Sequence, residues 1–354
     1  MSSVLPIKEY AHLIELPRRV LIGYDVIKHL GKFVIELVED TREVAIVTGP
    51  NIIKYLGRFC EESLSDEGIR YNWFIANNAN KDTVNMLEKK IDADTIIGFG
   101  GGKSVDVAKS IAYNLEKPFI SVPTSASHDG IASPFASIRG NDKPYSLTTR
   151  MPVGILADVK VISEAPKRLL ASGCGDLLAK ITAVRDWQLA RDENGEYFGS
   201  YSANLASLSA SIIMEEAKDI ANYKEFTRTV VEALISSGVA AGIAGSSRPC
   251  SGSEHLFSHA LEYIAPNKGL HGERCGLGTI MMAKLHGLDW EKIIDTLKNI
   301  DAPTTAYEIG ITRDEVVKAL VIAKDIRPER YTILHKINID EEKAFELAKS
   351  TGII

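Results

Sequence analysis

Three of the chain's eight histidines lie in one short segment, SGSEHLFSHALEYIAPNKGLHGERCG, and are the strongest sign of chemistry. His255 and His259 are four residues apart, so on a helix both project from the same face. His271 follows an Asn-Lys-Gly turn, from which the chain can fold back toward His255. Histidines at this spacing indicate a metal site or neighbouring roles in one pocket. The motif is not HExxH, because Glu254 precedes His255.

A catalytic metal site with two histidines needs a third ligand and an open position, and a carboxylate is the usual complement. Asp176, in ASGCGDLLAK, is the candidate. We expect it in the first turn of a helix, directly after a glycine-rich bend. On the residues alone, stabilisation of that helix N-terminus is the favoured interpretation of Asp176.

A second site is indicated by Gly98, Gly100, Gly101 and Gly102, which lie between an apolar run and a helix that begins near Lys103. Glycines at a helix N-terminus let backbone N–H groups approach a phosphate closely. The P-loop pattern nevertheless fails, because Ile97 stands where it needs glycine, and the dinucleotide fingerprint fails at Lys103. A turn that only connects strand and helix is the competing interpretation.

Small hydroxyl residues dominate the segment from Val122 to Ile138, VPTSASHDGIASPFASI, with His128 and Asp129 at its middle. We expect this segment to be a loop that lines a pocket. Turn capping by serine and threonine is the plainer alternative.

The elements that must position these residues alternate in the first half of the chain. Short β-branched runs predict strands, and helical periodicity fills the intervals at 51–68, at 82–90 and from residue 103. Such alternation predicts a parallel sheet with helices on both faces, whose ligands bind beyond the carboxyl ends of the strands. The expected strands are 20–22, 43–48, 71–75, 94–97, 119–122 and 153–158, with a hairpin at 143–150.

Beyond residue 163 the periodicity becomes helical throughout. We therefore expect two domains, a Rossmann-like α/β domain at 1–162 and an all-helical domain at 163–354. The expected helices are 175–191, 201–222, 224–244, 253–264, 273–287, 289–300, 313–326 and 340–350.

Composition limits the partners. The 354 residues carry a net charge of −6, so there is no basic excess for nucleic acid or an anionic membrane surface. The four cysteines form no CxxC pair and are expected to be reduced thiols. We find no signal peptide and no apolar run that approaches 18 residues, so we expect a cytoplasmic protein without stable membrane insertion.

The motifs GGGKSVDVAK, VPTSASHDGIASPFAS, GCGDLLAK, SGSEHLFSHALE and LHGERCG together resemble the metal-dependent polyol dehydrogenase family. That family includes glycerol dehydrogenase and is related in fold to dehydroquinate synthase. The resemblance runs in the expected order from about residue 15 to about residue 290. It implies a Rossmann-like domain, a helical domain and a nicotinamide cofactor in the cleft between them.

The resemblance also assigns residues. It implies that Asp176, His255 and His271 bind one Zn²⁺ per subunit. Asp129 and His259 are then the catalytic residues, and together with Asp176 they face the substrate. The implied contacts to NAD(H) or NADP(H) are Gly102, Lys103, Ser104, Val105, Asp106, Thr124, Ser125, Ala126, Ser127 and Ser133.

Within the family the motifs are most similar to an archaeal branch that reduces dihydroxyacetone phosphate to sn-glycerol 1-phosphate for ether-lipid synthesis. The resemblance further implies a homo-oligomer, whether dimer, tetramer or octamer. Zinc, iron and nickel all suit the ligand set. The candidate residues for the substrate phosphate, which the sequence does not rank, are Arg139, Lys143, Arg150, Lys268 and Arg274.

Other functions stay open at this point. A glycerol dehydrogenase would act on the unphosphorylated polyol, and a lyase of the dehydroquinate synthase type would use the cofactor only transiently. A P-loop ATPase is disfavoured by Ile97. A non-catalytic binding protein does not explain why two candidate pockets converge.

Overall fold

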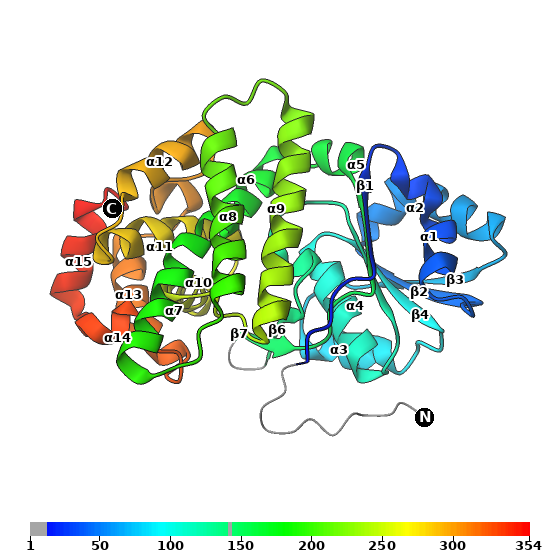
Figure 1. Cartoon of the computed structure of the whole chain (residues 1–354), viewed down its shortest axis with the longest axis horizontal. Coiled ribbons are helices and arrows are strands. Elements are labelled where there is room, and N and C mark those ends of the chain that lie inside the picture. Colours follow the sequence, from blue (N-terminus) through cyan, green and yellow to red (C-terminus); the bar gives the residue numbers. More distant parts are fainter. Residues whose placement is uncertain (1–12, 141–143) are drawn as a thin grey trace.

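The computed structural model describes residues 13–140 and 144–354. Figure 1 shows a half that contains the sheet and a half made of helices, with helix α9 running along the boundary. The predicted fold class, an α/β part followed by a helical part, is confirmed. The predicted boundary at 162/163 falls inside helix α5 (Val159–Ser163) and stays a prediction.

The sheet has six parallel strands in the spatial order β1-β8-β5-β4-β2-β3. All six predicted strands are present, and β2 has the predicted bounds. Because the strands are parallel, the segments that follow β4 and β5 leave the sheet at the same edge. The strands are β1 (Arg19–Gly23), β2 (Glu43–Thr48), β3 (Arg70–Ile75), β4 (Thr95–Gly100), β5 (Phe119–Pro123) and β8 (Gly154–Asp158).

Both faces of the sheet are covered, as predicted. Along β2, Val44 and Ile46 pack in the core beneath α1 and α2, whereas Ala45 and Val47 pack beneath α3 and α4. This alternation is the two-residue period of a strand buried on both faces. The covering elements are η1 (Val26–His29), α1 (Leu30–Leu37), α2 (Pro50–Asp66), α3 (Lys81–Glu88) and α4 (Gly102–Asn114).

The segment predicted as a loop from Val122 to Ile138 is only partly irregular. A short 3₁₀ helix, η2 (Asp129–Ile131), lies in it, and its end forms strand β6 (Phe135–Arg139). β6 pairs with antiparallel β7 (Pro144–Thr148), so the predicted hairpin at 143–150 is the second strand of a ribbon that begins earlier. Ala136 and Ile138 are buried, which explains why this polar segment forms a strand.

The second half is helical, as predicted, and its core is continuous with one face of β8 through Ile155 and Ala157. α10 and α13 have the predicted bounds. Its elements are α5 (Val159–Ser163), α6 (Lys167–Leu178), α7 (Lys180–Asn194), α8 (Ser200–Glu216), α9 (Tyr223–Ala244), α10 (Ser253–Ile264), α11 (His271–Leu285), α12 (Trp290–Asn299), η3 (Tyr307–Ile309), α13 (Arg313–Ile326), α14 (Ile333–Ile337) and α15 (Glu341–Ser350).

The prediction for the surroundings of Asp176 is wrong. Asp176 lies near the end of α6, which begins at Lys167, and the glycines before it are helical. They allow close packing instead of a bend. A Cβ on Gly173 would stand 2.0 Å from the carbonyl oxygen of Ala126, and one on Gly175 would stand 2.3 Å from that of Gly272. Glycine at these two positions lets α6 pack directly against the backbone of the segments that contain Ala126 and Gly272.

Helix α9 is the one element in the described part of the chain that is long and apolar enough to cross a membrane. Its 18-residue window has a mean hydropathy of 1.2, and 61% of that window is buried inside the protein. Val230, Val231 and Leu234 belong to the core of the helical half. The helix thus packs as a core helix does.

Candidate metal and cofactor site

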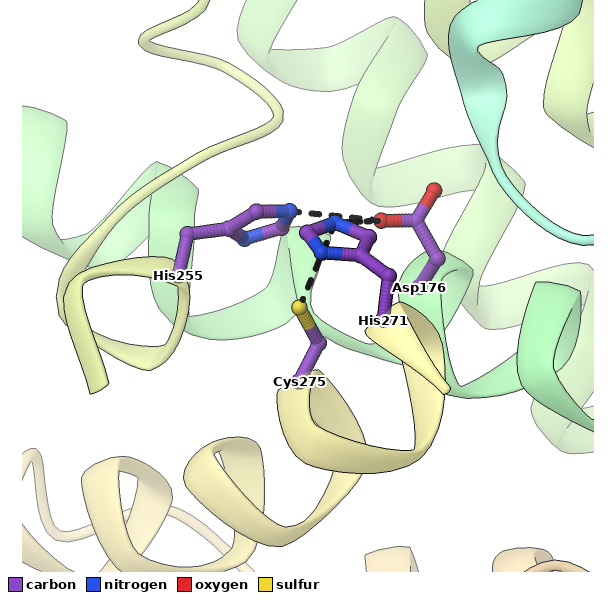
Figure 2. Close-up of side chains that lie close together, drawn as sticks. All are labelled: Asp176, His255, His271 and Cys275. Carbon is purple, nitrogen blue, oxygen red and sulfur yellow. Dashed lines mark hydrogen bonds and ion pairs between the residues drawn. The ribbon is translucent and has the colours of Figure 1, made fainter. Parts of the chain in front are cut away.

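Asp176, His255 and His271 come together although they lie on three different helices. Figure 2 shows both imidazoles turned toward the Asp176 carboxylate. Oδ1 of Asp176 is 3.3 Å from Nε2 of His255 and 3.8 Å from Nε2 of His271. A tetrahedral ion with bonds of about 2.0–2.2 Å to such atoms separates its ligands by roughly 3.3 Å. One oxygen and two nitrogens therefore stand at spacings that fit a divalent metal.

The other oxygen of Asp176 is already occupied. Oδ2 accepts a hydrogen bond from the backbone N–H of Asp129, at 3.0 Å, and lies 3.1 Å from Nζ of Lys180. Lys180 is fully buried and also pairs with Oδ2 of Asp129, at 2.8 Å. The lysine thereby holds both carboxylates in place, and Oδ1 of Asp176 is left to face the histidines.

Buried charges set the protonation of this cluster. Burial alone would raise the pKa of the Asp176 carboxyl, but Lys180, His255 and His271 hold that pKa well below its usual range. Burial lowers the pKa of His271 well below its ordinary value. The pKa of His255 is shifted the other way: burial would lower it, but Cys275 and Asp176 raise it well above its ordinary value. Because a metal binds the ionised carboxylate and the neutral imidazole, metal binding requires His255 to release its proton.

His255 is oriented by the residue before it. Its Nδ1 lies 2.8 Å from Oε1 of Glu254, which leaves Nε2 facing Asp176. Glu254 is fully buried and also accepts hydrogen bonds from Thr182 Oγ1 and from the backbone N–H of Gly252. A carboxylate behind a ligating histidine fixes the tautomer and raises the basicity of the ligand. The sequence analysis did not assign this role to Glu254.

Cys275 is a further potential ligand that the sequence analysis missed. Its Sγ lies 3.6 Å from Nε2 of His271, and the ligand atoms of all four residues lie within 4.8 Å of one another. The spacing in the sequence could have indicated Cys275, because it follows His271 by one helical turn on α11 and so lies on the same face of the helix. All four cysteines are buried and free, as expected for reduced thiols.

The histidine expected to face the substrate lies beside the cluster. The His259 ring centroid is 6.0 Å from that of His271, and both residues line the same cavity of about 350 Å³. Burial lowers the pKa of His259 well below its ordinary value, and the charge of Arg327 lowers it further. His259 is therefore neutral at neutral pH. Asp129 lines the same cavity.

The glycine stretch lies at the sheet edge, as predicted. Gly100 has a φ of +152°, which only glycine adopts readily, and its carbonyl accepts the N–H of Thr124 at 3.0 Å. A Cβ on Gly102 would stand 1.9 Å from Nε2 of His128. The segments after β4 and β5 are thus hydrogen-bonded together at the N-terminus of α4.

The residues expected to contact the cofactor divide into two groups. Gly102, Lys103, Asp106 and Ser133 line the cavity. The other six lie in the same two segments but outside the residues that line it: Ser104, Val105, Thr124, Ser125, Ala126 and Ser127. The Val105 side chain packs in the core between sheet and helices.

Asp106 has an unused acceptor. Its Oδ2 accepts the backbone N–H of Ser137 at 3.1 Å, whereas the buried Oδ1 has no hydrogen-bond donor among the described residues. The nearest cation, Nζ of Lys109, is 3.7 Å from Oδ1. A ligand hydroxyl or amide that enters the cavity would satisfy this oxygen, so the site fits a polar cofactor.

The predicted phosphate-binding residues do not gather in one place. Arg139 and Arg274 line the cavity, and both pair with Glu262. Lys268 pairs with Glu315 at 2.7 Å, and the guanidinium of Arg150 lies over the ring of Tyr113. Lys143 lies outside the described residues. A cation that the sequence analysis did not consider, Arg327, also lines the cavity.

Known proteins share this architecture. A model of the iron-containing alcohol dehydrogenase family matches residues 21–166. The crystal structure of glycerol dehydrogenase from Schizosaccharomyces pombe has a TM-score of 0.77 at 22% identity and covers 96% of this chain and 90% of its own. An iron-containing alcohol dehydrogenase from Thermotoga maritima has a TM-score of 0.73 at 17% identity, over 96% of this chain and 99% of its own. The fold is therefore that of the iron-type alcohol dehydrogenases.

Relatives with a more similar sequence define the family more narrowly. Glycerol-1-phosphate dehydrogenase (NAD(P)+) of Nitrosopumilus maritimus is 50% identical over 97% of this chain and 98% of its own length. The protein of the same name from Cenarchaeum symbiosum is 52% identical over 97% of both. The chain belongs to the glycerol-1-phosphate dehydrogenase family and is an oxidoreductase. The resemblance stated from the motifs is thereby confirmed.

Proposed function

We propose that this chain reduces dihydroxyacetone phosphate to sn-glycerol 1-phosphate with NADH or NADPH, and so supplies the glycerol backbone of ether-type membrane phospholipids. The single observation that carries the proposal is the cluster of Asp176, His255 and His271, whose two histidines line the cavity that also reaches the glycine stretch. Two relatives with about half of their residues identical to this chain carry the name of this reaction's reverse direction.

Asp176 Oδ1 and the Nε2 atoms of His255 and His271 would hold the metal, which we propose to be one Zn²⁺ per subunit. When bound, the metal supplies a Lewis acid for the ketone oxygen, and the nicotinamide supplies the hydride. The donor set of one carboxylate and two imidazoles fits zinc and leaves a coordination position for substrate.

Side chains around the cluster would bind the substrate and transfer the proton. Lys180 pairs with Asp129 at 2.8 Å and orients its carboxylate, which can accept a hydrogen bond from a substrate hydroxyl. The neutral imidazole of His259 carries one N–H and one acceptor nitrogen. We assign it a proton relay, in which the N–H gives its proton to the product oxygen while the other ring nitrogen takes one from solvent water. Asp129, His259 and Asp176 are thus the proposed substrate-binding residues.

For the cofactor we propose the N-terminus of α4, from Gly102 to Asp106, together with Thr124 to Ser127 and Ser133. The backbone N–H groups of this helix end favour a pyrophosphate, and Lys103 adds a positive charge beside them. The free Oδ1 of Asp106 accepts a hydroxyl or amide N–H from the bound cofactor. We further propose a cytoplasmic homo-oligomer with the domain boundary near residue 162.

The test is steady-state oxidation of NADH or NADPH by the purified chain with dihydroxyacetone phosphate, with product analysis. We expect stoichiometric cofactor consumption and a glycerol phosphate that an sn-glycerol-3-phosphate-specific dehydrogenase does not oxidise. Product of the opposite configuration would overturn the stereochemical assignment. Turnover of the substrate without net cofactor consumption would point instead to a lyase-type reaction.

A further inference from the structure

Four cations line the cavity, and three of them have partners. Arg139 and Arg274 share the carboxylate of Glu262. Lys103 donates to the backbone carbonyl of Asn77 at 2.9 Å, at the glycine end of the cavity. The guanidinium of Arg327 has neither a hydrogen bond nor an ion pair with any residue that the structure describes.

Arg327 follows the end of α13 and is only partly exposed. Glu329 is the one carboxylate whose charge acts on it appreciably, and it lies beyond the range of an ion pair. A partly buried charge without a counter-ion is costly, because its lost hydration is not replaced. An anionic ligand would remove that cost.

The surroundings of Arg327 add positive charge. The neighbouring Arg330 donates to the Oγ of Ser247, at 2.8 Å, and to the backbone carbonyl of Ser251. Ser247 and Ser251 line the cavity with Arg327. Burial lowers the pKa of Arg330 to about 9, so its guanidinium is still charged at neutral pH. Arg327, Ser247 and Ser251 thus form one wall of the cavity, and both serines are hydrogen-bonded to a second guanidinium, that of Arg330.

This wall is close to the proposed site of reduction. Arg327 and His259 line the same cavity. His259 in turn lies beside His271 of the metal cluster. A three-carbon substrate can therefore present its ketone to the cluster and its anionic end to Arg327.

We propose that Arg327 binds the phosphate of the ketone substrate, and that it, more than Arg139 or Arg274, selects a phosphorylated ketone over an unphosphorylated one. The planar guanidinium donates two parallel N–H bonds to a phosphate, for which a lysine is a poorer substitute. The assignment deepens the proposed function and rests on it.

The kinetic test compares Arg327→Met with Arg327→Lys in the zinc-loaded full chain. We expect Arg327→Met to raise KM for dihydroxyacetone phosphate about 100-fold and Arg327→Lys about 10-fold, as loss of charge-assisted bonds predicts. The kcat/KM for dihydroxyacetone should stay within about twofold. The matched control is Arg313→Met at the other end of α13, where the guanidinium pairs with Asp314 on the surface. A large KM effect from Arg139→Met, with none from Arg327→Met, would overturn the assignment.

A binding measurement separates this inference from the reaction. Inorganic phosphate should raise the Tm of the metal-free wild-type chain and of Arg313→Met, but not that of Arg327→Met. Equal stabilisation of all three would contradict a phosphate site at Arg327, whatever the enzyme catalyses. If phosphate stabilises the chain only when Arg327 is present, but the chain does not reduce dihydroxyacetone phosphate, the anion site at Arg327 would be supported. The proposed function would then be overturned.

Discussion

At the scale of single residues, the two oxygens of Asp176 have separate tasks. Oδ2 is taken by Lys180 and by the N–H of Asp129, and Oδ1 faces His255 and His271. A carboxylate fixed on one side needs little reorganisation to bind an ion on the other. The charge of this buried group is balanced inside the protein before a metal arrives.

His271→Ala should remove metal and activity together, because it deletes one of three proposed ligands. We expect the metal content after dialysis to fall from about one per chain to below about one tenth, at least a 10-fold loss of affinity. Elemental analysis by mass spectrometry measures it. The matched control is His29→Ala, since His29 is exposed on η1. Wild-type metal content in His271→Ala would remove this histidine from the ligand set.

Lys180→Met should destabilise the chain strongly, because it leaves two neighbouring carboxylates without their shared cation. Loss of one partner from a buried pair costs about 3–5 kcal/mol, whereas loss of a surface pair costs about 0–1 kcal/mol. Urea unfolding of the metal-free proteins measures the free energy of unfolding of each variant. The surface control is Lys218→Met, which removes the exposed pair of Lys218 with Glu215.

The pH dependence of the Lys180 effect has a definite sign. Burial lowers the pKa of Lys180, but Asp129 and Asp176 raise it well above the ordinary value. A raised pKa contributes stability that is complete below the unfolded lysine pKa and is lost as pH rises through the folded one. The difference between wild type and Lys180→Met should thus be constant from about pH 6 to 9, below the ordinary lysine pKa. Equal free energies of unfolding for wild type and Lys180→Met would contradict a stabilising role of the buried Lys180 ion pairs.

At the scale of elements, α6 and α11 are held close by glycines at their contact. A Cβ on Gly272 would stand 1.7 Å from the carbonyl oxygen of Ser172, and one on Gly175 would meet Gly272 in the same way. Asp176 and His271 are the immediate neighbours of these glycines. Two of the three proposed metal ligands, Asp176 and His271, are therefore positioned by backbone-to-backbone packing of α6 and α11.

Gly175→Ala should force these helices apart. We expect a loss of about 1–3 kcal/mol in the free energy of unfolding, as for other overpacked sites, together with weaker metal binding. Gly276→Ala on α11 is the matched control, since its Cβ would have no neighbour closer than 3.4 Å. That variant should be neutral or gain up to about 1 kcal/mol from helix propensity. Similar effects in the two variants would rule out backbone contact as the cause.

The sequence predicted elements best where their own residues carry a clear pattern. β2 was predicted with its observed bounds because it is a short β-branched run that Gly49-Pro50 ends, and α10 because its apolar residues recur at helical spacing. Short elements such as α1, α5 and α14 were missed, since tertiary packing more than periodicity specifies them. The glycines of GCGD were interpreted as a bend because the close approach of Ala126 and Gly272 is invisible in the sequence.

The site was predictable to the extent that its residues carry motifs. The geometry brings Asp176, His255 and His271 together as the motifs imply, and Asp129 and His259 line the same cavity. Lys180, Glu254 and Arg327 were not singled out. Their importance comes from contacts between segments far apart in the chain, and a lone Lys, Glu or Arg is most often an exposed surface residue.

At the scale of the whole molecule, the cavity joins the two halves of the chain. Gly102 and Asp106 come from the sheet half, whereas His255, His271 and Arg327 come from the helical half. Such an arrangement would place the proposed cofactor at the carboxyl ends of the parallel strands and the proposed metal opposite it. The proposed reduction of the ketone therefore requires both halves at once.

The most direct test of this account measures NADH and NADPH oxidation with dihydroxyacetone phosphate and with dihydroxyacetone, before and after chelation, with zinc then returned. We predict fast oxidation with the phosphorylated ketone alone, lost on chelation and restored by zinc. Activity that survives complete removal of metal would contradict the role of the Asp176, His255 and His271 cluster. Activity with only the unphosphorylated ketone would contradict the proposed substrate and leave a polyol dehydrogenase.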